Sequence, residues 1–417
     1  MAISIMDLEL RRKRAAAAFG TSNDIILIGA GMPISVPGGA DQTFQFQPHP
    51  EYFWLTGRHR EGGVLAFERN GGWTLFEPAL SESEQVWGGS ESPIGRPVTE
   101  LDEWLKERSG RAVKWLGVPK DAEADKDLRE AITHARRPKD ASEIALMQRA
   151  ATATAVGHAA GRAKIKIGAT EREVQIDIES AMYHAGADRT GYGTIVGSGP
   201  NSTVLHSEPG TRKFQDGDVI VIDAGGAVDG YTADVTRTYP ANGKFDADQQ
   251  FIYDAVLRAQ IETIEACKVG AEWTDIHGLS ARLMAESLIE YGVIKCSVDE
   301  ALETEVISMF FPHGIGHMVG LGVRDAGGPL PGREKKKVAG ITLRMDIPLE
   351  AGYIVTVEPG LYFNRVLLRS EERRAKFKDA VDWARIEPWI GKLGVRIEDN
   401  ILVTSDGPVN LTKAIPK

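Results

Sequence analysis

The pattern of apolar and polar residues changes once along the chain, near residue 137. Before that point, short apolar runs between glycines and prolines predict four strands. They lie at 25–28, 52–55, 64–67 and 73–76. Two further segments, 100–109 and 125–135, repeat their apolar residues at helical spacing. Residues 1–137 are therefore predicted to form a small mixed α/β domain.

Residues 138–417 are predicted to form a second, larger α+β domain. Asp140 with Glu143, and Thr170 with Glu173, have the spacing of capping boxes, so each pair should open a helix. Strand patterns follow these two helices, and the same order of helices and strands then recurs. The later helices are expected at 247–267 and 274–291, and the strands at 193–196, 203–206, 352–363 and 394–404. This repetition predicts two pseudo-duplicated halves that face each other.

The stretch 219–239 predicts one β-hairpin with two acidic residues on one face. Its first arm is β-branched, and Asp229-Gly230 is a dipeptide that tight hairpin turns prefer. This turn would place Asp223 opposite Thr236, with Asp234 diagonally across from Asp223. Two carboxylates in apolar surroundings repel each other and lose hydration, so we expect a cation or a shared proton beside them. The alternative is a solvated face of the hairpin.

Further ionisable residues lie downstream in apolar or glycine-rich stretches. His313 and His317 are four residues apart, but no glutamate follows His313, which excludes the zincin pattern. Glu358 ends an apolar strand, and Glu398 shares a strand face with Arg396. Each of these residues could be structural when taken alone. An ionisable group in an apolar strand is nevertheless costly unless it is paired, and so the group of them indicates a site.

Asp223, Asp234, His317, Glu358 and Glu398 together offer four carboxylates and one imidazole. A single zinc ion usually takes fewer protein ligands, so this oxygen-rich set suits a centre of two divalent ions with bridging carboxylates. Hard oxygen donors favour manganese, whereas the imidazole leaves cobalt, iron and zinc open. The predicted chemistry is hydrolysis by metal-activated water.

Composition and charge limit the expected partners and compartment. Charged residues make up 26% and hydrophobic residues 42% of the chain, which is ordinary for a globular protein. The net charge of -10 argues against nucleic acid or an anionic membrane as a main partner. No apolar run is long enough to span a bilayer, and residues 1–20 fit no secretory signal. Two cysteines are too few for a disulfide framework, which favours the cytoplasm.

Four motifs, in this order, resemble the proline-specific branch of the pita-bread metallopeptidases, which includes prolidase and aminopeptidase P. They are the Asp-x10-Asp hairpin, His-Gly-Ile-Gly-His, Val-Glu-Pro-Gly-Leu-Tyr and Val-Arg-Ile-Glu-Asp. The resemblance implies a creatinase-type first domain and a pita-bread catalytic domain. It also implies that Asp234 and Glu398 bridge two metal ions. Asp223 would bind one ion, and His317 with Glu358 the other, with Glu358 also acting as general base.

The resemblance further implies a set of substrate-pocket residues. His206 would steady the substrate or the tetrahedral intermediate. The other matching positions are Tyr192, His313, Tyr362 and Arg396, although the tyrosines could instead belong to the core. Arg324 departs from the family, which usually has a substrate-contacting histidine there. Because arginine cannot shuttle a proton near neutral pH, Arg324 would act by charge alone, leave the task to His206, or point to solvent.

The insert 326–350, which contains Arg344, resembles prolidase more than aminopeptidase P. In prolidases the matching arginine binds the free carboxylate of a dipeptide through two parallel hydrogen bonds. We therefore predict a prolidase that hydrolyses the imide bond of Xaa-Pro dipeptides through a metal-bridging hydroxide. The alternatives are an aminopeptidase P acting on longer Xaa-Pro peptides and a non-catalytic, peptidase-like binding module. The resemblance also implies a homodimer.

Overall fold

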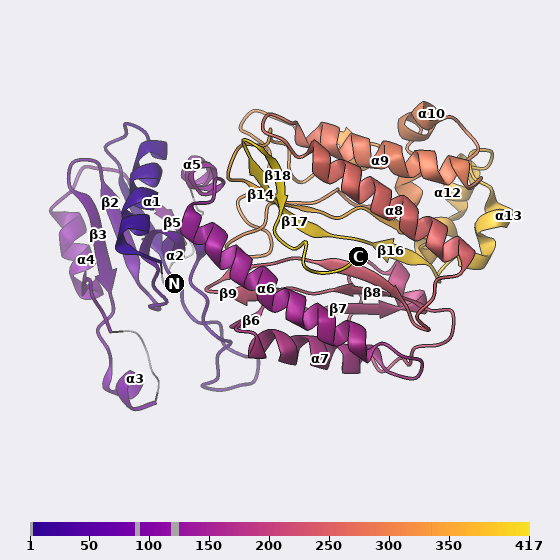
Figure 1. Cartoon of the computed structure of the whole chain (residues 1–417). Helices are drawn as coiled ribbons and strands as arrows, with labels where there is room; N and C mark the ends of the chain where they lie inside the picture. Colours follow the sequence, from indigo (N-terminus) through magenta and orange to yellow (C-terminus); the bar gives the residue numbers. More distant parts are fainter. Residues whose placement is uncertain (1–2, 88–91, 118–124, 335) are drawn as a thin grey trace. The chain divides into compact units, whose positions relative to one another are not determined.

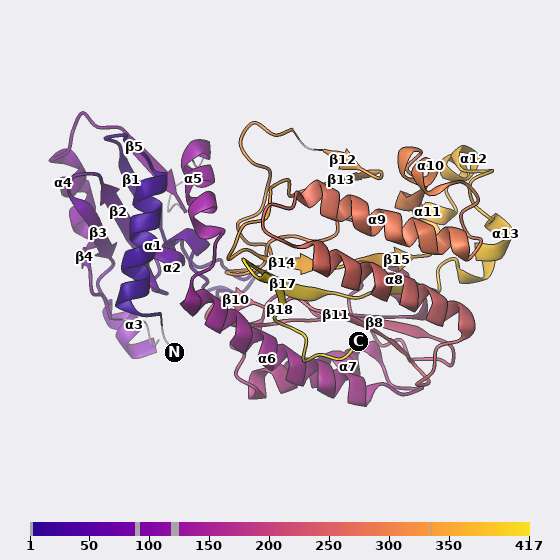
Figure 2. The ribbon, with the colours of Figure 1, turned by 45° about the horizontal axis from the view of Figure 1, so that its top comes forward.

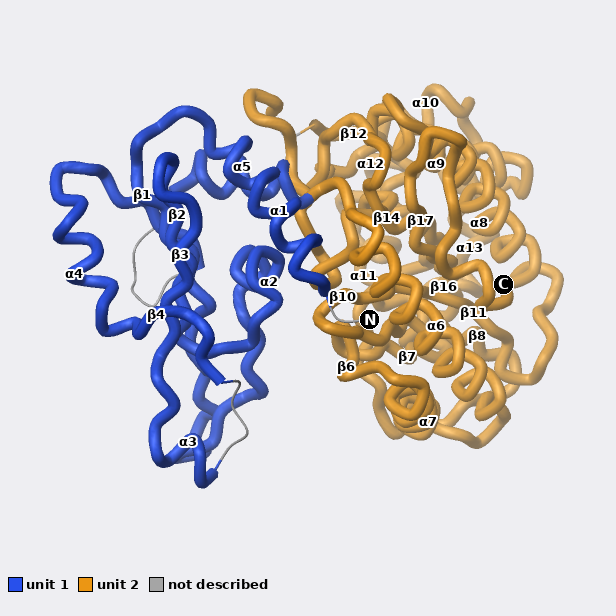
Figure 3. Tube along the Cα trace, turned by 60° about the vertical axis from the view of Figure 1, so that its left-hand side comes forward, with its two compact units in different colours: residues 1–136 blue, residues 137–417 orange. Residues whose placement is uncertain are grey.

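The chain forms two compact units, residues 1–136 and 137–417 (Figures 1 and 3). The computed structural model describes residues 3–87, 92–117, 125–334 and 336–417. Within them, no helix is both long and apolar enough to cross a membrane.

The first unit is a five-stranded sheet with helices. The strand order is β4-β3-β2-β1-β5, and β1 runs antiparallel to β2 but parallel to β5. The strands are β1 (Ile25–Gly29), β2 (Val64–Glu68), β3 (Gly72–Glu77), β4 (Arg96–Pro97) and β5 (Val113–Leu116). The helices are α1 (Ile5–Ala18), α2 (Pro50–Thr56), α3 (Glu82–Trp87), η1 (Val98–Glu100), α4 (Leu101–Lys106) and α5 (Lys126–Arg136).

The prediction of a strand at 52–55 is wrong, because these residues lie in α2. Pro50 occupies the first turn of this helix, and Gly57 ends it in the left-handed region at φ 64°. Every residue from Glu51 to Thr56 is buried. A short helix that is buried on all sides shows no amphipathic period, and so its sequence resembles that of a buried strand.

In the second unit, a layer of strands lies between two pairs of long helices (Figures 1 and 2). The pair α6 (Ala141–Lys164) and α7 (Glu171–His184) covers one side, and the pair α8 (Ala247–Ala266) and α9 (Trp273–Glu290) covers the other. Both predicted capping boxes are present at the starts of α6 and α7. Each helix pair packs its own hydrophobic cluster against the strands.

Ten further helices and strands of this unit are short and lie outside the two strand ladders described below. They are η2 (Gly199–Thr203), α10 (Val298–Glu303), η3 (Val306–Met309), β12 (Lys337–Val338), β13 (Ile341–Thr342), α11 (Arg365–Leu368), α12 (Glu371–Lys376), α13 (Trp383–Ile386), η4 (Glu387–Trp389) and β18 (Gly407–Asn410). The prediction of a strand at 203–206 is wrong, since these residues end η2 and form the turn after it.

The predicted hairpin is present in register but broken in the middle of each arm. β8 (Val219–Asp223) pairs with β11 (Thr236–Pro240) and places Asp223 opposite Thr236, as predicted. β9 (Gly226–Val228) pairs with β10 (Tyr231–Thr232) in a different sheet, which β6 (Arg189–Thr190) completes. β7 (Ile195–Ser198) pairs with β8 and completes the sheet of β8 and β11. The arms approach closely at the break, where a Cβ on Gly225 would lie 1.8 Å from the Ala233 carbonyl oxygen.

A second ladder in the same unit is broken in the same way. β14 (Ile354–Val357) pairs with β17 (Asp399–Thr404), whereas β15 (Gly360–Tyr362) pairs with β16 (Gly394–Arg396). The breaks fall at Glu358-Pro359 and Ile397-Glu398. Two broken ladders, each covered by a pair of helices, confirm the predicted pseudo-duplication and the pita-bread fold. The breaks matter because they release acidic side chains from regular strands.

The burial of His277 in α9 should make the unfolding free energy depend on pH. Its side chain is inaccessible to solvent and packs against Phe311, with the ring centroids 5.2 Å apart. Burial lowers the pKa of His277 to about 4, because a charged imidazolium would lose its hydration. In the unfolded chain a histidine titrates near pH 6.5, so the unfolded state binds more protons between about pH 4 and 6.5. Stability should therefore fall as the pH is lowered through this window.

Urea unfolding of the metal-free protein at pH 7 and pH 4 measures this effect. We expect His277 alone to lower the unfolding free energy by roughly 2–3 kcal/mol between pH 7 and pH 4. The drop measured for His277→Leu should therefore be smaller than that of the native chain by the same amount. An identical pH dependence in the variant would contradict the assignment.

Candidate metal centre

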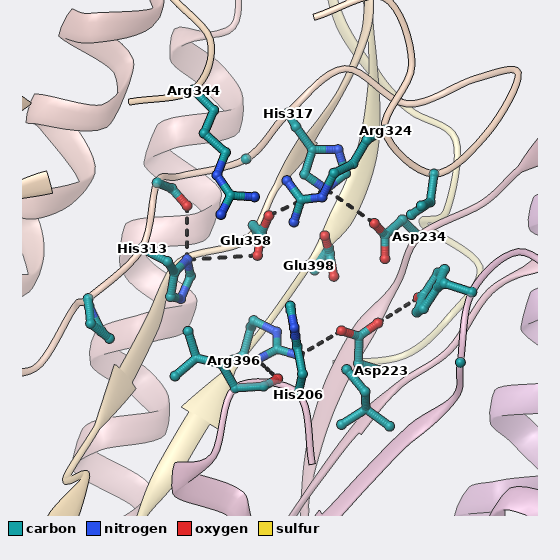
Figure 4. A pocket seen from close by; sticks show the side chains of 18 of the residues that line it. His206, Asp223, Asp234, His313, His317, Arg324, Arg344, Glu358, Arg396 and Glu398 are labelled. Carbon is teal, nitrogen blue, oxygen red and sulfur yellow. Dashed lines mark hydrogen bonds and ion pairs between the residues drawn. The ribbon is translucent and has the colours of Figure 1, made fainter. Parts of the chain in front are cut away.

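The strand breaks of the second unit surround a cavity of about 610 Å³. Figure 4 shows that acidic, basic and imidazole side chains from both ladders converge in this cavity. It is lined by all the residues predicted for the site except Tyr362, namely Tyr192, His206, Asp223, Asp234, His313, His317, Arg324, Arg344, Glu358, Arg396 and Glu398. The fold thus brings together residues up to 206 positions apart in the sequence, from Tyr192 to Glu398.

Asp234, His317 and Glu398 form the tightest cluster in the cavity. Each offers one ligand atom, and the three atoms lie within 4.8 Å of one another. His317 Nε2 is 3.4 Å from Asp234 Oδ2. His317 Nδ1 is 2.9 Å from the Met318 carbonyl oxygen, which can only accept, so Nδ1 carries a proton and Nε2 is the nitrogen that faces the cluster. A backbone carbonyl that orients the imidazole in this way is typical of metal-binding histidines.

Asp223 and Glu358 flank this cluster rather than belonging to it. Glu358 Oε1 lies 3.7 Å from His317 Nε2. Asp223 is already engaged, because it accepts hydrogen bonds from the Tyr192 hydroxyl at 2.5 Å and from Arg396 Nη2 at 2.6 Å. The five predicted ligands therefore lie around one cavity as a close trio with a carboxylate on either side.

The electrostatics of the cavity suit a cation. Burial raises the pKa of Glu358 to about 7, with Asp234 and Asp223 adding to the shift and His317 and Arg396 opposing it. Burial and the neighbouring carboxylates also hold the pKa of Glu398 well above its ordinary value. Burial likewise raises the pKa of Asp223 despite Arg396. The described positive groups thus fail to compensate these carboxylates, and divalent ions with oxygen ligands would do so.

His313 fixes the direction in which the Tyr362 hydroxyl beside Arg396 donates its hydrogen bond. His313 Nδ1 lies 2.9 Å from the Gly314 carbonyl oxygen and must donate to it, so Nε2 accepts from the Tyr362 hydroxyl at 3.1 Å. That hydroxyl in turn accepts from Arg396 Nη1 at 2.9 Å. Burial and the charge of Arg396 lower the pKa of His313 to about 3, so this imidazole stays neutral. Tyr362 therefore lies behind the cavity wall, where it connects His313 to Arg396.

Thr236 is a site residue that sequence reasoning missed. Its hydroxyl donates to Glu398 Oε2 at 2.7 Å and accepts from Arg396 Nε at 3.0 Å. The hydroxyl thus connects a predicted ligand to the guanidinium that holds Asp223. The signal was available, because the predicted hairpin register already places Thr236 opposite Asp223.

Asn400 is a second residue that was missed. Its side-chain amide bonds both backbone groups of Asp234, accepting from the nitrogen at 3.0 Å and donating to the oxygen at 2.6 Å. These bonds replace the ladder that Asp234 lacks, since Asp234 lies between β10 and β11. No feature of the sequence alone indicates this partnership across 166 residues.

His206, Arg324 and Arg344 are the exposed members of the site. Figure 4 shows all three side chains at the cavity, so Arg324 lines the cavity although it is also exposed to solvent. Among the described residues, no hydrogen bond or ion pair engages the guanidinium of Arg324 or Arg344. Both groups are therefore available to a ligand in the cavity.

A glycine brings His317 into position. The loop before His317 passes so close to β14 that a Cβ on Gly316 would lie 2.1 Å from the Thr356 carbonyl oxygen. The backbone nitrogen of His317 then donates to Thr356 Oγ1 at 3.0 Å. Because β14 leads directly into Glu358, this contact sets the distance between His317 and Glu358.

The broken ladders and the carboxylate cavity together define a pita-bread metallopeptidase. Residues 145–405 match the model of metallopeptidase family M24, and residues 8–96 match the N-terminal domain of aminopeptidase P. The chain belongs to metallopeptidase family M24.

Named relatives agree with this assignment. The chain is 35% identical to a probable Xaa-Pro aminopeptidase of Botryotinia fuckeliana, over 90% of this chain and 86% of that protein. It is 31% identical to the probable Xaa-Pro aminopeptidase of Penicillium rubens, over 90% and 87%. Among solved structures, aminopeptidase PepP from Pseudomonas aeruginosa superposes with a TM-score of 0.82 at 26% identity, over 100% of this chain and 97% of that chain. Aminopeptidase P from E. coli, solved with the inhibitor Pro-Leu, gives 0.83 at 26% identity with the same coverage.

These comparisons correct the predicted function. The prediction of the pita-bread family is confirmed, but the prediction of a prolidase within it is wrong, because the relatives and structural neighbours are Xaa-Pro aminopeptidases. The error came from the insert 326–350 and Arg344. An exposed guanidinium at a cavity can bind any carboxylate or carbonyl, and so its presence does not specify the carboxylate of a dipeptide.

Proposed function

We propose that this chain is an Xaa-Pro aminopeptidase, which releases the N-terminal residue from peptides with proline in the second position. The observation that carries the proposal is the cavity in which Asp234, His317 and Glu398 present ligand atoms within 4.8 Å of one another. The names of the relatives support the specificity for proline. Localisation in the cytoplasm and a homodimeric state stay predictions from the sequence.

The side chains around the cavity fit a centre of two divalent ions. Asp223, Asp234, His317, Glu358 and Glu398 would hold these ions. The four carboxylates favour manganese, with cobalt, zinc or iron open. When bound, the ions would polarise the scissile carbonyl and make water nucleophilic near neutral pH.

The remaining chemistry falls to residues of the chain. We assign Glu358 as general base, since its carboxylate lies beside the cluster, 3.7 Å from His317 Nε2, where it can reach a water held there. The proton that it accepts must reach the proline nitrogen when the imide bond breaks. His206, at the exposed side of the cavity, would donate to the oxygen of the tetrahedral intermediate. Tyr192 and Arg396 would hold Asp223 in place through the two hydrogen bonds that they donate to it.

A panel of four peptides tests the proposed function. Metal-depleted protein is supplied with manganese, cobalt or zinc and is assayed with Ala-Pro-Ala, Ala-Pro, Ala-Ala-Ala and N-acetyl-Ala-Pro-Ala. We expect rapid release of alanine from Ala-Pro-Ala only, because the activity requires proline in second position, a peptide continuing beyond it and a free N-terminus. Hydrolysis of Ala-Pro with no hydrolysis of Ala-Pro-Ala would overturn the proposal. Absence of hydrolysis with every metal would favour the peptidase-like binding module.

Arg324 and Arg344 should recognise the part of the peptide that follows proline. Ala-Pro-Ala carries one carboxylate, at its C-terminus, and guanidinium groups bind carboxylates well. We expect Arg344→Ala and Arg324→Ala each to raise KM for Ala-Pro-Ala by about fivefold, an effect limited by solvent screening at these exposed positions. KM for the amide Ala-Pro-Ala-NH2 should change less.

Arg69→Ala provides the matched control, because Arg69 is exposed in the first unit, away from the cavity residues in the sequence. Steady-state kinetics on both peptides measure the effect. An equal rise in KM for Ala-Pro-Ala and for Ala-Pro-Ala-NH2 would show that the two arginines do not bind the C-terminal carboxylate.

A further inference from the structure

Arg237 is a buried charge that takes no part in lining the cavity. It follows Thr236 on β11, and its side chain is inaccessible to solvent. Nη1 donates to the backbone oxygens of Thr236 at 2.9 Å and Glu398 at 2.6 Å. A buried guanidinium is costly unless its donors and its charge are compensated, so the partners of its other two nitrogens are informative.

Those partners come from a segment far away in the sequence. Nη2 donates to Asp399 Oδ1 at 2.7 Å and to the Ile415 carbonyl oxygen at 2.8 Å. Nε donates to the carbonyl oxygens of Pro416 at 3.1 Å and Ile415 at 3.2 Å. Residues 415–416 therefore hold one side of the guanidinium with backbone carbonyls, while the opposite side holds Glu398.

The counter-ion Asp399 is held by the same segment. It is inaccessible to solvent, and its Oδ2 accepts from Gln260 at 2.9 Å and lies 3.0 Å from Lys417 Nζ. Lys417 Nζ also donates to Gln260 Oε1 at 2.6 Å. Asp399 is thus flanked by two positive groups, Arg237 at Oδ1 and Lys417 at Oδ2.

This network replaces a ladder at the position where Glu398 needs support. Glu398 lies in the break between β16 and β17, and its nitrogen donates across to the Thr236 oxygen at 3.0 Å. Its carbonyl oxygen accepts from Arg237, and its carboxylate accepts from Thr236. The position of the carboxylate in the cavity thus depends on Arg237 remaining fixed.

We propose that residues 415–417, acting through Arg237 and Asp399, are positioning residues for Glu398 and thereby set the affinity of the cavity for divalent metal. The proposal rests on the proposed metal centre, and none of these residues contacts the cavity. Partners that orient a metal ligand from behind typically contribute about 10–100-fold in metal affinity.

The test measures manganese binding to the metal-depleted chain by titration calorimetry. Deletion of residues 415–417 should weaken manganese binding about tenfold or more. Lys417→Met should weaken manganese binding about threefold. Lys417→Arg should keep the native manganese affinity, since either cation can pair with Asp399. Lys413→Met is the matched control, because Lys413 is an exposed lysine of the same segment. Circular dichroism and melting temperatures check that each variant is folded.

The outcomes separate a positioning role from a structural one. Weaker manganese binding by variants that are shown to be folded supports the proposal. A lower melting temperature with manganese affinity unchanged within about twofold overturns it, because the segment would then serve stability alone. If the deletion variant fails to fold, Lys417→Met and Asp399→Asn decide by the same criterion. If the native chain binds no manganese, cobalt or zinc, the proposed metal centre fails together with this inference.

Discussion

Replacement of Glu358 by glutamine is expected to lower kcat on Ala-Pro-Ala by a factor of about 10³. The amide keeps the size of the side chain but cannot take a proton from water, and it is a poorer ligand than a carboxylate. The chain should stay folded, since a neutral amide relieves the repulsion from Asp234 and Asp223 that helps to raise the pKa of Glu358. Steady-state kinetics with saturating manganese measure the effect.

Glu265→Gln is the matched control for this prediction, because Glu265 is an exposed glutamate on α8 that does not line the cavity. Its kcat should equal that of the native chain. A Glu358→Gln variant that keeps more than about a tenth of the native kcat would remove Glu358 from the role of general base.

Metal depletion is expected to have the second large effect. Treatment with a chelator should reduce the activity on Ala-Pro-Ala to about 1% or less, and added manganese should restore it. Manganese at about 100 times its Kd should also stabilise the folded chain by about 2.7 kcal/mol, since the separated ligands of the unfolded chain bind weakly. For a unit of this size the gain corresponds to a rise of about 5 °C in melting temperature.

Asp234→Asn should abolish both the recovery of activity and the rise in melting temperature, because Asp234 belongs to the tight cluster with His317 and Glu398. Asp406→Asn, at an exposed loop position, should behave like the native chain. A full manganese-induced shift in the Asp234→Asn variant would place the metal elsewhere.

The parts of the fold that follow from local rules were predictable from the sequence. The capping boxes at Asp140 and Thr170 are correct because each is a hydrogen-bonded unit of four consecutive residues. The hairpin register is correct for the same reason, since Asp229-Gly230 sets it locally. The segment 52–55 failed because burial on all sides removes the period that separates a helix from a strand.

The breaks in the two ladders were not predictable. The segments 352–363 and 394–404 read as continuous strands, but each changes partner at its glutamate. The alternation of apolar and polar residues in a strand indicates which residues are buried but not which strand they pair with. A change of partner strand therefore does not alter this alternation. These breaks nevertheless allow the side chains of Glu358 and Glu398 to point into the same cavity.

The sequence by itself determined the ligand candidates, the pita-bread family and the order of the two halves, because these depend on residue types and on short-range spacing. Only the tertiary structure decided that Asp223 is shared between Tyr192 and Arg396 and that Thr236 supports Glu398. These contacts join residues from about 30 to more than 170 positions apart. Such pairs form only when distant strands pack together and their ladders break at neighbouring positions. A local sequence pattern does not specify contacts of this range.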